Sequence, residues 1–352
     1  MTSKEIKRPL VQLSTTQASG LPPGFSVIRL VALMRRAIVA TGLNLSAMTV
    51  LTEAATGAYG VTAVIAAMAG AMRVHAFVRP SSYGTVSEVN DWTSLLARTA
   101  GVAERIDIIE EISPESLDKV DIVTNSGHLR PLTATLIDHL PSSAVIALMF
   151  EAWEFRPDDI DIRSCARRGI PVVGINEQHE AVDVFSFLGP LSVKHLHDCG
   201  LAVYRNRIAL VCDNSFAEPI KRGLAGLGGL VDVFCDVEAV LPEDWDVVLV
   251  ALSPGREPRI GNAEARHLAA VMPAEAIVVQ FWGDVDRSAA MSYSLNVWPR
   301  QPPSAGHMAI LLSAIGPEPI VRLQTGGLRA AEWIRRGGDT SPNGFAQLVQ
   351  LT

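Results

Sequence analysis

Residues 46–84, SAMTVLTEAATGAYGVTAVIAAMAGAMRVHAFVRPSSYG, decide the fold of this 352-residue chain. They predict an apolar strand, a loop of small residues, a helix and a second strand that ends just before Arg79. Two parallel strands joined by a helix form a βαβ unit. In nucleotide-binding units of this kind, a small-residue loop lets backbone N–H groups at the helix N-terminus reach a phosphate. The stretch therefore predicts a nucleotide-binding domain built on a parallel sheet.

The residue after the second strand distinguishes the two nicotinamide dinucleotides. An acid there binds a free ribose 2′-OH, whereas an arginine neutralises a 2′-phosphate. Arg79 therefore predicts NADP as the cofactor, with NAD as the alternative. The loop departs from the full G-x-G-x-x-G pattern, and small-residue turns also serve packing alone. The residues expected to bind the cofactor are Thr56, Gly57, Tyr59, Gly60, Arg79, Ser81 and Ser82.

Length and composition indicate a globular protein of two domains. A chain of 352 residues exceeds what one core usually holds, and 48% hydrophobic with 19% charged residues is typical of well-packed proteins. The formal charge of −7 and the absence of a basic stripe argue against a nucleic-acid partner. The mean hydropathy of +0.25 indicates additional buried surface, for which a homodimer is the simplest explanation.

Neither a metal site nor a membrane segment is expected. Cys165, Cys199, Cys212 and Cys235 are far apart in sequence and have no histidine at metal-ligand spacing, so buried thiols in a reducing compartment are the favoured interpretation. The N-terminus lacks the hydrophobic region of a signal peptide, and the longest apolar run is too short to span a bilayer. We therefore expect a cytoplasmic protein without a membrane partner.

Strands and helices alternate along most of the chain, which predicts a parallel sheet covered on both faces. The outline of residues 50–74 returns at the same length in residues 208–232. The fold class is thus α/β, with two tandem Rossmann-like domains joined by a long helix. The expected segments are an N-terminal helical segment (1–46), a first nucleotide-binding domain (47–178), a bridging helix (179–205), a second, smaller domain (206–300) and C-terminal helices with a tail (301–352).

Polar residues follow several predicted strands, where ligands of open parallel sheets bind. Three neighbouring strand ends of the first domain deliver histidine, carboxylate, arginine and tryptophan side chains to one edge. His128 is expected to act as acid or base, with Glu151 or Glu177 as its carboxylate partner. An ion pair between Glu154 and Arg156 that merely closes a loop is the structural alternative for that segment. The predicted substrate-binding residues are Asn125, Trp153, Arg156, Trp282 and Asp284.

Two segments of the first domain resemble known families. Residues 121–128, DIVTNSGH, followed by residues 136–146, LIDHLPSSAVI, are similar to the cofactor domains of S-adenosylhomocysteine hydrolases and D-2-hydroxyacid dehydrogenases. The resemblance covers roughly residues 47–180. It implies an NAD(P)-binding Rossmann domain and does not identify a substrate.

Two classes of function remain open at this point. The first is an NADP-preferring oxidoreductase that acts on a small polar metabolite between the domains. The second is a non-redox protein, either a nucleotide- or S-adenosylmethionine-dependent transferase or a catalytically silent ligand-binding relative. The incomplete glycine pattern favours the second class, and residues 53–60, EAATGAYG, distantly resemble a methyltransferase loop. Arg79 favours the first, because methyltransferases usually place an acid at that position.

Overall fold

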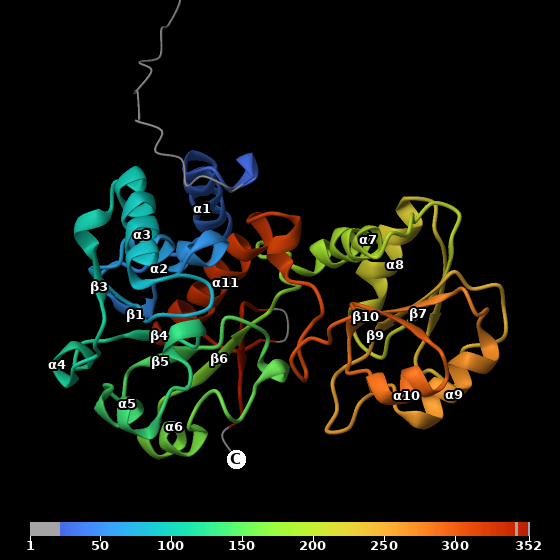
Figure 1. Ribbon diagram of the computed structural model, residues 1–352. Helices are drawn as coiled ribbons and strands as arrows, with labels where there is room; N and C mark the ends of the chain where they lie inside the picture. The colour runs from blue at the N-terminus through green and yellow to red at the C-terminus, as the bar shows by residue number, and fades with distance from the viewer. Residues whose placement is uncertain (1–21, 342–343, 351–352) are drawn as a thin grey trace, which may run out of the picture.

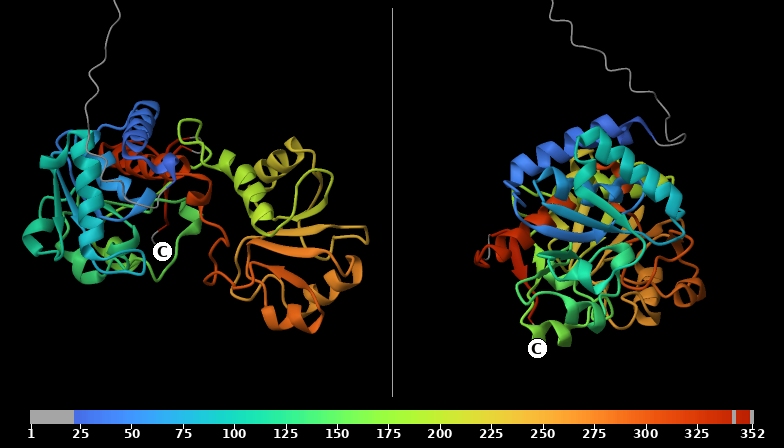
Figure 2. Two further views of the ribbon diagram at one scale, coloured as in Figure 1. Left: turned by 45° about the horizontal axis from the view of Figure 1, so that its top comes forward. Right: turned by 90° about the vertical axis from the view of Figure 1, so that its left-hand side faces the viewer.

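The computed structural model describes residues 22–341 and 344–350. It has two lobes joined by two crossings of the chain (Figure 1, Figure 2). The first lobe contains a seven-stranded sheet and the second a five-stranded sheet. Every pair of neighbouring strands is parallel except the pair at one edge of the first sheet. The predicted α/β fold with two Rossmann-like domains is thus confirmed.

The first sheet has the strand order of a dinucleotide-binding domain. Along the sheet the order is β12-β6-β5-β4-β1-β2-β3. Without the added edge strand β12, this is the Rossmann order, whose direction of winding reverses between the first and fourth strands. That switch point therefore lies between β1 and β4. The strands are β1 (Thr49–Glu53), β2 (Arg73–Phe77), β3 (Ile106–Ile109), β4 (Ile122–Thr124), β5 (Val145–Ala147), β6 (Val172–Ile175) and β12 (Ala346–Leu348).

Helices cover both faces of the first sheet. One face packs against α1 (Val27–Thr41), α2 (Val61–Met68), α3 (Val86–Ala100) and α11 (Glu318–Arg335). The other face packs against α4 (Pro114–Leu117), α5 (Ala134–His139) and α6 (Ile162–Arg168). Helix α2 is buried on nearly all sides because it lies between the sheet and three other helices, which explains its apolar sequence.

The C-terminal segment completes the first domain and is not a separate tail. The sequence predicts helix over residues 304–336, but α11 begins only at Glu318, after the short turn η7 (Leu312–Ile315). Strand β12 then pairs antiparallel with β6. Its three residues carry no pattern that distinguishes a strand from a loop. At the other end, part of the predicted segment 1–46 lies outside the described residues, and α1 packs against α3 and α11.

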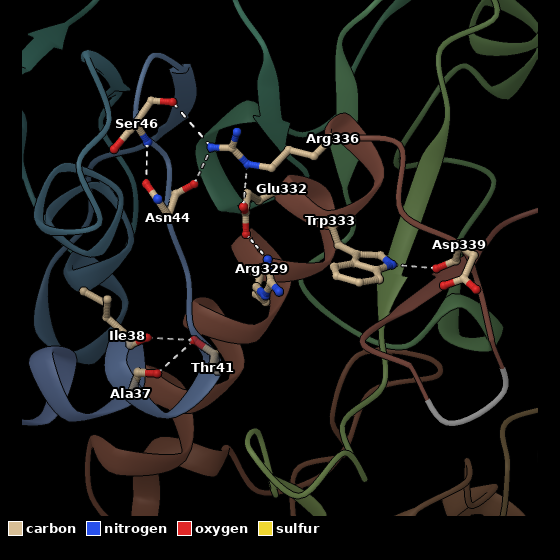
Figure 3. A network of polar contacts seen from close by, with 10 residues as sticks. All are labelled: Ala37, Ile38, Thr41, Asn44, Ser46, Arg329, Glu332, Trp333, Arg336 and Asp339. Atoms are coloured by element: carbon tan, nitrogen blue, oxygen red, sulfur yellow. Dashed lines mark hydrogen bonds and ion pairs between the residues drawn. The ribbon is translucent and has the colours of Figure 1, made fainter.

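A polar network anchors α11 to the connection between α1 and β1 (Figure 3). The Glu332 side chain is buried and accepts hydrogen bonds from Arg329 and, at 2.6 Å, from Nε of Arg336. Arg336 also donates to the carbonyl oxygen of Asn44 at 2.9 Å. The indole N–H of Trp333 donates to the carbonyl oxygen of Asp339 at 2.7 Å. Glu332 thus links the last turns of α11 to the start of the first sheet.

We expect Glu332→Ala to lower the free energy of unfolding by about 3 kcal/mol, because it leaves two arginines without their buried carboxylate. The measurement is urea unfolding followed by circular dichroism. Glu318→Ala, in the first turn of the same helix, is the matched control, since its ion pairs with Arg29 and Arg322 are partly exposed. Such pairs contribute at most about 1 kcal/mol. Equal losses in both variants would contradict the anchoring role of Glu332.

The second domain has a smaller sheet with its own switch point between β7 and β9. The strand order is β11-β10-β9-β7-β8. Helices α7 and α8 cover one face, and α9 and α10 cover the other. The elements are α7 (Leu188–Asp198), β7 (Arg207–Val211), α8 (Ala217–Gly226), β8 (Leu230–Phe234), β9 (Val247–Ala251), α9 (Asn262–Val271), β10 (Ile277–Trp282), α10 (Arg287–Ser292) and β11 (Asn296–Trp298).

The predicted bridging helix is shorter than its expected range, 179–205. Helix α7 begins at Leu188, after the turn η6 (Phe185–Phe187). The preceding residues form a loop because the N–H of Val184 donates to the carbonyl oxygen of Glu177, and Asp183 has a left-handed backbone. This loop returns the chain to the end of β6 before it crosses to the second domain. Among the described residues, no helix combines the length and apolar character needed to cross a membrane.

Candidate functional site

The loop between β1 and α2 leaves backbone donors without partners. A short turn, η2 (Gly57–Gly60), precedes α2. Within the described part of the chain, no oxygen accepts the backbone N–H groups of residues 55–58. Gly57 has a left-handed backbone (φ +59°), and the space beside its Cα is open. Consecutive free N–H groups before a helix suit an anion such as a phosphate.

Gly60, the last glycine of this loop, has a packing role. A Cβ atom at Gly60 would lie 2.4 Å from the carbonyl oxygen of Ala55 and 2.8 Å from the ring of Trp92. The Trp92 indole donates to the carbonyl oxygen of Gly57 at 3.0 Å. Thr56 donates its hydroxyl to the carbonyl oxygen of Tyr83, within the exposed turn that carries Ser81 and Ser82. The α3 tryptophan therefore holds the loop in shape, a role that sequence reasoning missed.

Glu53 lies at the switch point of the first domain. It is the last residue of β1, its side chain is buried, and its Oε2 accepts the N–H of His128 at 2.9 Å. A Cβ atom at Gly127 would lie 2.2 Å from that oxygen. Burial raises the pKa of Glu53, and the nearby Arg130 and Arg79 oppose that rise. The sequence signal is an acid that ends an apolar strand, which by itself does not assign Glu53 to the site.

Arginines from two strand ends surround Glu53. The guanidinium of Arg79 donates to the carbonyl oxygen of Arg130 at 3.1 Å, which brings the end of β2 beside the end of β4. Arg130 donates to the backbone oxygen of Asn125 at 2.8 Å and lies 3.6 Å from Asp159. Burial and the charge of Arg79 lower the pKa of His128. This neighbourhood of Glu53, which we call the switch-point cluster, consists of Glu53, Tyr59, Arg79, Asn125, His128 and Arg130.

Asn125 carries an unsatisfied donor in the switch-point cluster. Its side chain is fully buried, and its Oδ1 accepts a hydrogen bond from Nε of Arg130 at 3.2 Å. Because a guanidinium only donates, the amide orientation is fixed and Nδ2 is the remaining group. Nδ2 has no partner among the residues that the structure describes. A buried amide donor of this kind suits a ligand oxygen or a water.

A second group, which we call the carboxyl cluster, consists of Glu151, Glu154 and Glu177 at the ends of β5 and β6. Glu151 is buried, and its Oε1 accepts the N–H of Glu177 at 3.0 Å. Glu154 belongs to the turn η5 (Ala152–Glu154) that follows. Gly174 in β6 allows the turn η5 to lie directly against that strand, because a Cβ atom at Gly174 would lie 2.3 Å from the backbone nitrogen of Ala152. The chain after β5 thus crosses directly over β6.

Burial and mutual repulsion shift the protonation of the carboxyl cluster. Burial raises the pKa of Glu177 well above its usual range, and the charges of Glu154 and Glu151 raise it further. Burial and the charge of Glu151 raise the pKa of Glu154 to about 7. The pKa of Glu151 is also raised by burial, although the hydrogen bond from Trp153 opposes the rise. Burial thus favours the protonated form of all three carboxyls.

Aromatic and polar contacts connect the carboxyl cluster to the second domain. The Trp153 indole donates to Glu151, and its ring centroid lies 5.4 Å from that of Trp282 and 6.3 Å from that of Phe216. Nη1 of Arg156 lies 2.9 Å from Nε2 of His307. His307 was not predicted from the sequence, because its partner is 151 residues away in the chain. These contacts place the cluster at the junction of the two domains.

The predicted site residues therefore form two neighbouring groups. Glu151, Trp153, Glu177 and Trp282 come together, with Arg156 at the same junction. Asn125 and His128 belong to the switch-point cluster, and among the described residues no hydrogen bond joins either to Glu151. The partly buried Arg130 lies near both groups, since the charges of Glu53 and Arg156 both influence its pKa.

Asp284, predicted to bind substrate, holds a loop. Both of its carboxylate oxygens accept the N–H of Gly306 at 3.1 Å. The indole of Trp282 donates to the carbonyl oxygen of Gly306 at 3.1 Å. These contacts fix the loop that presents His307 to Arg156. The aspartate thus positions a residue of the junction, and within the described ranges it forms no hydrogen bond with the carboxyl cluster.

The corresponding loop of the second domain is filled by protein groups. Asp213 follows β7, where its carboxylate accepts the N–H of Ser253 at 2.8 Å and pairs with Arg259 at 2.9 Å. Asn214 forms a turn before α8, in which its Oδ1 accepts the N–H of Phe216 at 3.0 Å. The ring of Phe216 stacks on Trp282 at 5.0 Å. A pyrophosphate would meet a carboxylate and an aromatic ring here, so the first domain has the loop that fits a dinucleotide.

The four cysteines differ in burial, because Cys165 and Cys212 are buried, Cys199 is half-buried and Cys235 is exposed. In the ranges 22–341 and 344–350, no group of three or more histidine, cysteine or acidic residues has the arrangement of a metal site. The four cysteines are free thiols. Burial raises the pKa of Cys165 to about 12 and that of Cys212 to about 11, so neither thiol ionises at neutral pH.

The sheets, the crossings and the clustered strand ends define a protein of two Rossmann-like domains. Solved structures with this fold include a dipicolinate synthase chain from Bacillus subtilis (TM-score 0.54, 11% identity, 84% of this chain and 99% of that chain). Others are a dipicolinate synthase chain from Bacillus halodurans (0.53, 11%, 80% and 96%) and the pyruvate reductase of Chlamydomonas reinhardtii (0.50, 13%, 85% and 99%). No protein-family model matches this sequence, and neither does any curated protein. The similarity thus establishes the fold implied by the resemblance to Rossmann cofactor domains.

Proposed function

We propose that this protein is a cytoplasmic oxidoreductase that binds a nicotinamide dinucleotide, with preference for NADP, and acts on a small polar metabolite where its two domains meet. The observation that carries the proposal is the pairing of an open phosphate-type loop after β1 with the clustered carboxyls of Glu151, Glu154 and Glu177 along the same sheet edge. Two of the structures with this fold are named as synthases and one as a reductase. We further propose that it acts as a homodimer without nucleic-acid or membrane partners.

The strand order supports one placement of the two halves of the cofactor. A Rossmann sheet binds one mononucleotide over each half, with the pyrophosphate at the first loop. The N–H groups of residues 55–58 would hold the pyrophosphate, and Arg79 beside β2 would reach a 2′-phosphate. The other half would extend over β4, β5 and β6, toward the carboxyl cluster and Trp153. Glu53 is compatible with a bound anion because its neutral form is favoured by burial.

The chain's own residues supply the proton chemistry, since the hydride chemistry belongs to the cofactor when bound. Burial favours the protonated forms of Glu177 and Glu154, which supports a role for either carboxyl as the proton donor to a substrate at the junction. Glu151 is fixed by Trp153 and the N–H of Glu177, so it orients the group. His128 stays neutral because its pKa is lowered, and it is the second acid or base candidate.

Arg79→Ala is expected to weaken NADPH binding roughly ten- to a hundredfold, because one charge-assisted contact contributes about 1.5–3 kcal/mol. NADH binding should change little, since NADH has no 2′-phosphate. The measurement is calorimetric titration with both dinucleotides. Arg98→Ala, an exposed arginine at the end of α3, is the matched control.

Three results would contradict the proposal in different ways. Absence of dinucleotide binding by the parent protein would refute it. Equal losses of NADPH and NADH would keep a dinucleotide but remove Arg79 from the 2′-phosphate. Binding of S-adenosylmethionine in place of both dinucleotides would favour the transferase alternative. The buried acid Glu53, which directly precedes the loop, is the reason to test this ligand.

A further inference from the structure

The carboxyl cluster lacks an ion-pair partner within the part of the chain that the structure describes. No ion pair of the described residues includes Glu151, Glu154 or Glu177. Glu177 is 8% exposed, and no hydrogen bond of the described residues reaches its carboxyl group. The charged groups that influence it are the other two carboxyls. An ionised carboxyl that is buried without a cation beside it is costly to the fold, so the group is suited to receive a positive charge.

Arg156, two residues after Glu154, is a positive charge that lacks a carboxylate partner among the described residues. No carboxylate of the described residues lies within ion-pair distance of its guanidinium, so the alternative of a Glu154–Arg156 ion pair is not observed. Its Nη1 instead contacts Nε2 of His307. Nδ1 of His307 lies 3.0 Å from the carbonyl oxygen of Ala305 and donates there, so Nε2 is the nitrogen that accepts from Arg156. Within residues 22–341 and 344–350, Arg156 thus has no carboxylate in an ion pair, and it lies near three carboxyls that have no cation in an ion pair.

An aromatic surface adjoins both groups. Trp153 is 47% exposed, and Trp282 and Phe216 from the second domain pack against it. Tryptophan faces attract organic cations, and aliphatic groups pack on them equally well. Because the described residues show no metal-site arrangement, an organic cation suits this position better than a metal ion does.

We propose that the junction binds a substrate with an ammonium group next to a carboxylate, that is, an amino acid or an N-substituted amino acid. The ammonium group is placed at Glu154 and Glu177, and the carboxylate at Arg156. The carbon skeleton packs on Trp153 and Trp282. This inference rests on the proposed function for its claim that the ligand is a substrate, and it names the class of that substrate.

The test uses the full-length protein and ligand-observed NMR. The probes are the twenty common amino acids, together with the 2-hydroxy acid and the decarboxylated amine that match the tightest one. We expect the amino acid to bind at least tenfold more tightly than either analogue. The double variant Glu154→Gln/Glu177→Gln should lose at least tenfold in affinity for it, and Arg156→Ala should lose its preference over the amine. Glu180→Gln, an exposed acid on the same loop, is the control.

The outcomes separate this inference from the proposed function. A 2-hydroxy acid that binds as well as the amino acid, or no amino-acid binding at 10-fold molar excess and above, overturns the inference. NADPH titration in the same samples reports on the proposed function. Dinucleotide binding without amino-acid binding would refute the amino-acid site and leave the proposed function in place. Amino-acid binding without dinucleotide binding would keep the site and remove the redox role.

Discussion

Gly174→Ala is expected to lower the free energy of unfolding by about 2–3 kcal/mol and to displace the carboxyl cluster. The new methyl group would lie 2.3 Å from the backbone nitrogen of Ala152 and 2.9 Å from the carbonyl carbon of Glu151. These are backbone atoms, so no side-chain rotation relieves the overlap and the segment after β5 must move. A displacement of catalytic groups by about 1 Å lowers the reaction rate by up to roughly a hundredfold.

Urea unfolding measures the loss of stability, and tryptophan fluorescence reports on the position of Trp153 at the junction. Trp153→Phe identifies its share of the signal. Gly226→Ala at the end of α8 is the matched control, because nothing lies within 4 Å of its added Cβ atom. If Gly174→Ala and Gly226→Ala were equally stable and had the same emission spectrum, the close crossing of the chain over β6 would be wrong.

The parallel sheets were predictable because their signals are local. The strand from residue 49 to 53, the buried helix α2 and the strand that ends before Arg79 each follow from apolar pattern and small-residue turns. The C-terminal strand β12 was not predictable. It is three residues long and is defined by its pairing with β6, about 170 residues earlier in the chain.

The candidate site likewise has features that the sequence predicts and features that it does not. Glu151 and Glu177 follow buried strands, so their place at one sheet edge could be inferred from topology alone. The contacts between individual side chains could not be inferred in this way. Arg156 is two residues from Glu154 but contacts His307 of a distant loop, and His128 offers its backbone N–H to Glu53. These choices depend on the turn η5 and on the docking of the second domain, which leave no periodic signal in the sequence.

The carboxyl cluster should make the protein less stable as the pH rises, and Glu154→Gln/Glu177→Gln should reverse this effect. Both carboxyls have a higher pKa in the folded protein than in the unfolded chain. The folded state therefore binds more protons between the unfolded pKa of 4.5 and the folded pKa of Glu154, about 7. The free energy of unfolding falls wherever the folded state binds more protons and the pH increases.

We therefore expect the free energy of unfolding of the parent protein to fall, relative to the double variant, from pH 5 to pH 8. The full shift of Glu154 alone corresponds to roughly 3 kcal/mol, and its partial exposure and the nearby Arg156 reduce that value. Histidines with lowered pKa values, such as the half-buried His128 and the buried His195, have the opposite pH dependence, so the difference between the two proteins isolates the carboxyls.

The measurement is urea unfolding of both proteins at pH 5, 6, 7 and 8, with Glu180→Gln as the exposed control. The double variant should be the more stable protein at pH 8, although it has lost the proposed ammonium-binding group. An amino acid that binds the parent should restore part of its stability at pH 8, because its ammonium group compensates the ionised carboxyls. Parallel pH profiles of the parent and the double variant would show that these glutamates are not desolvated in the folded protein.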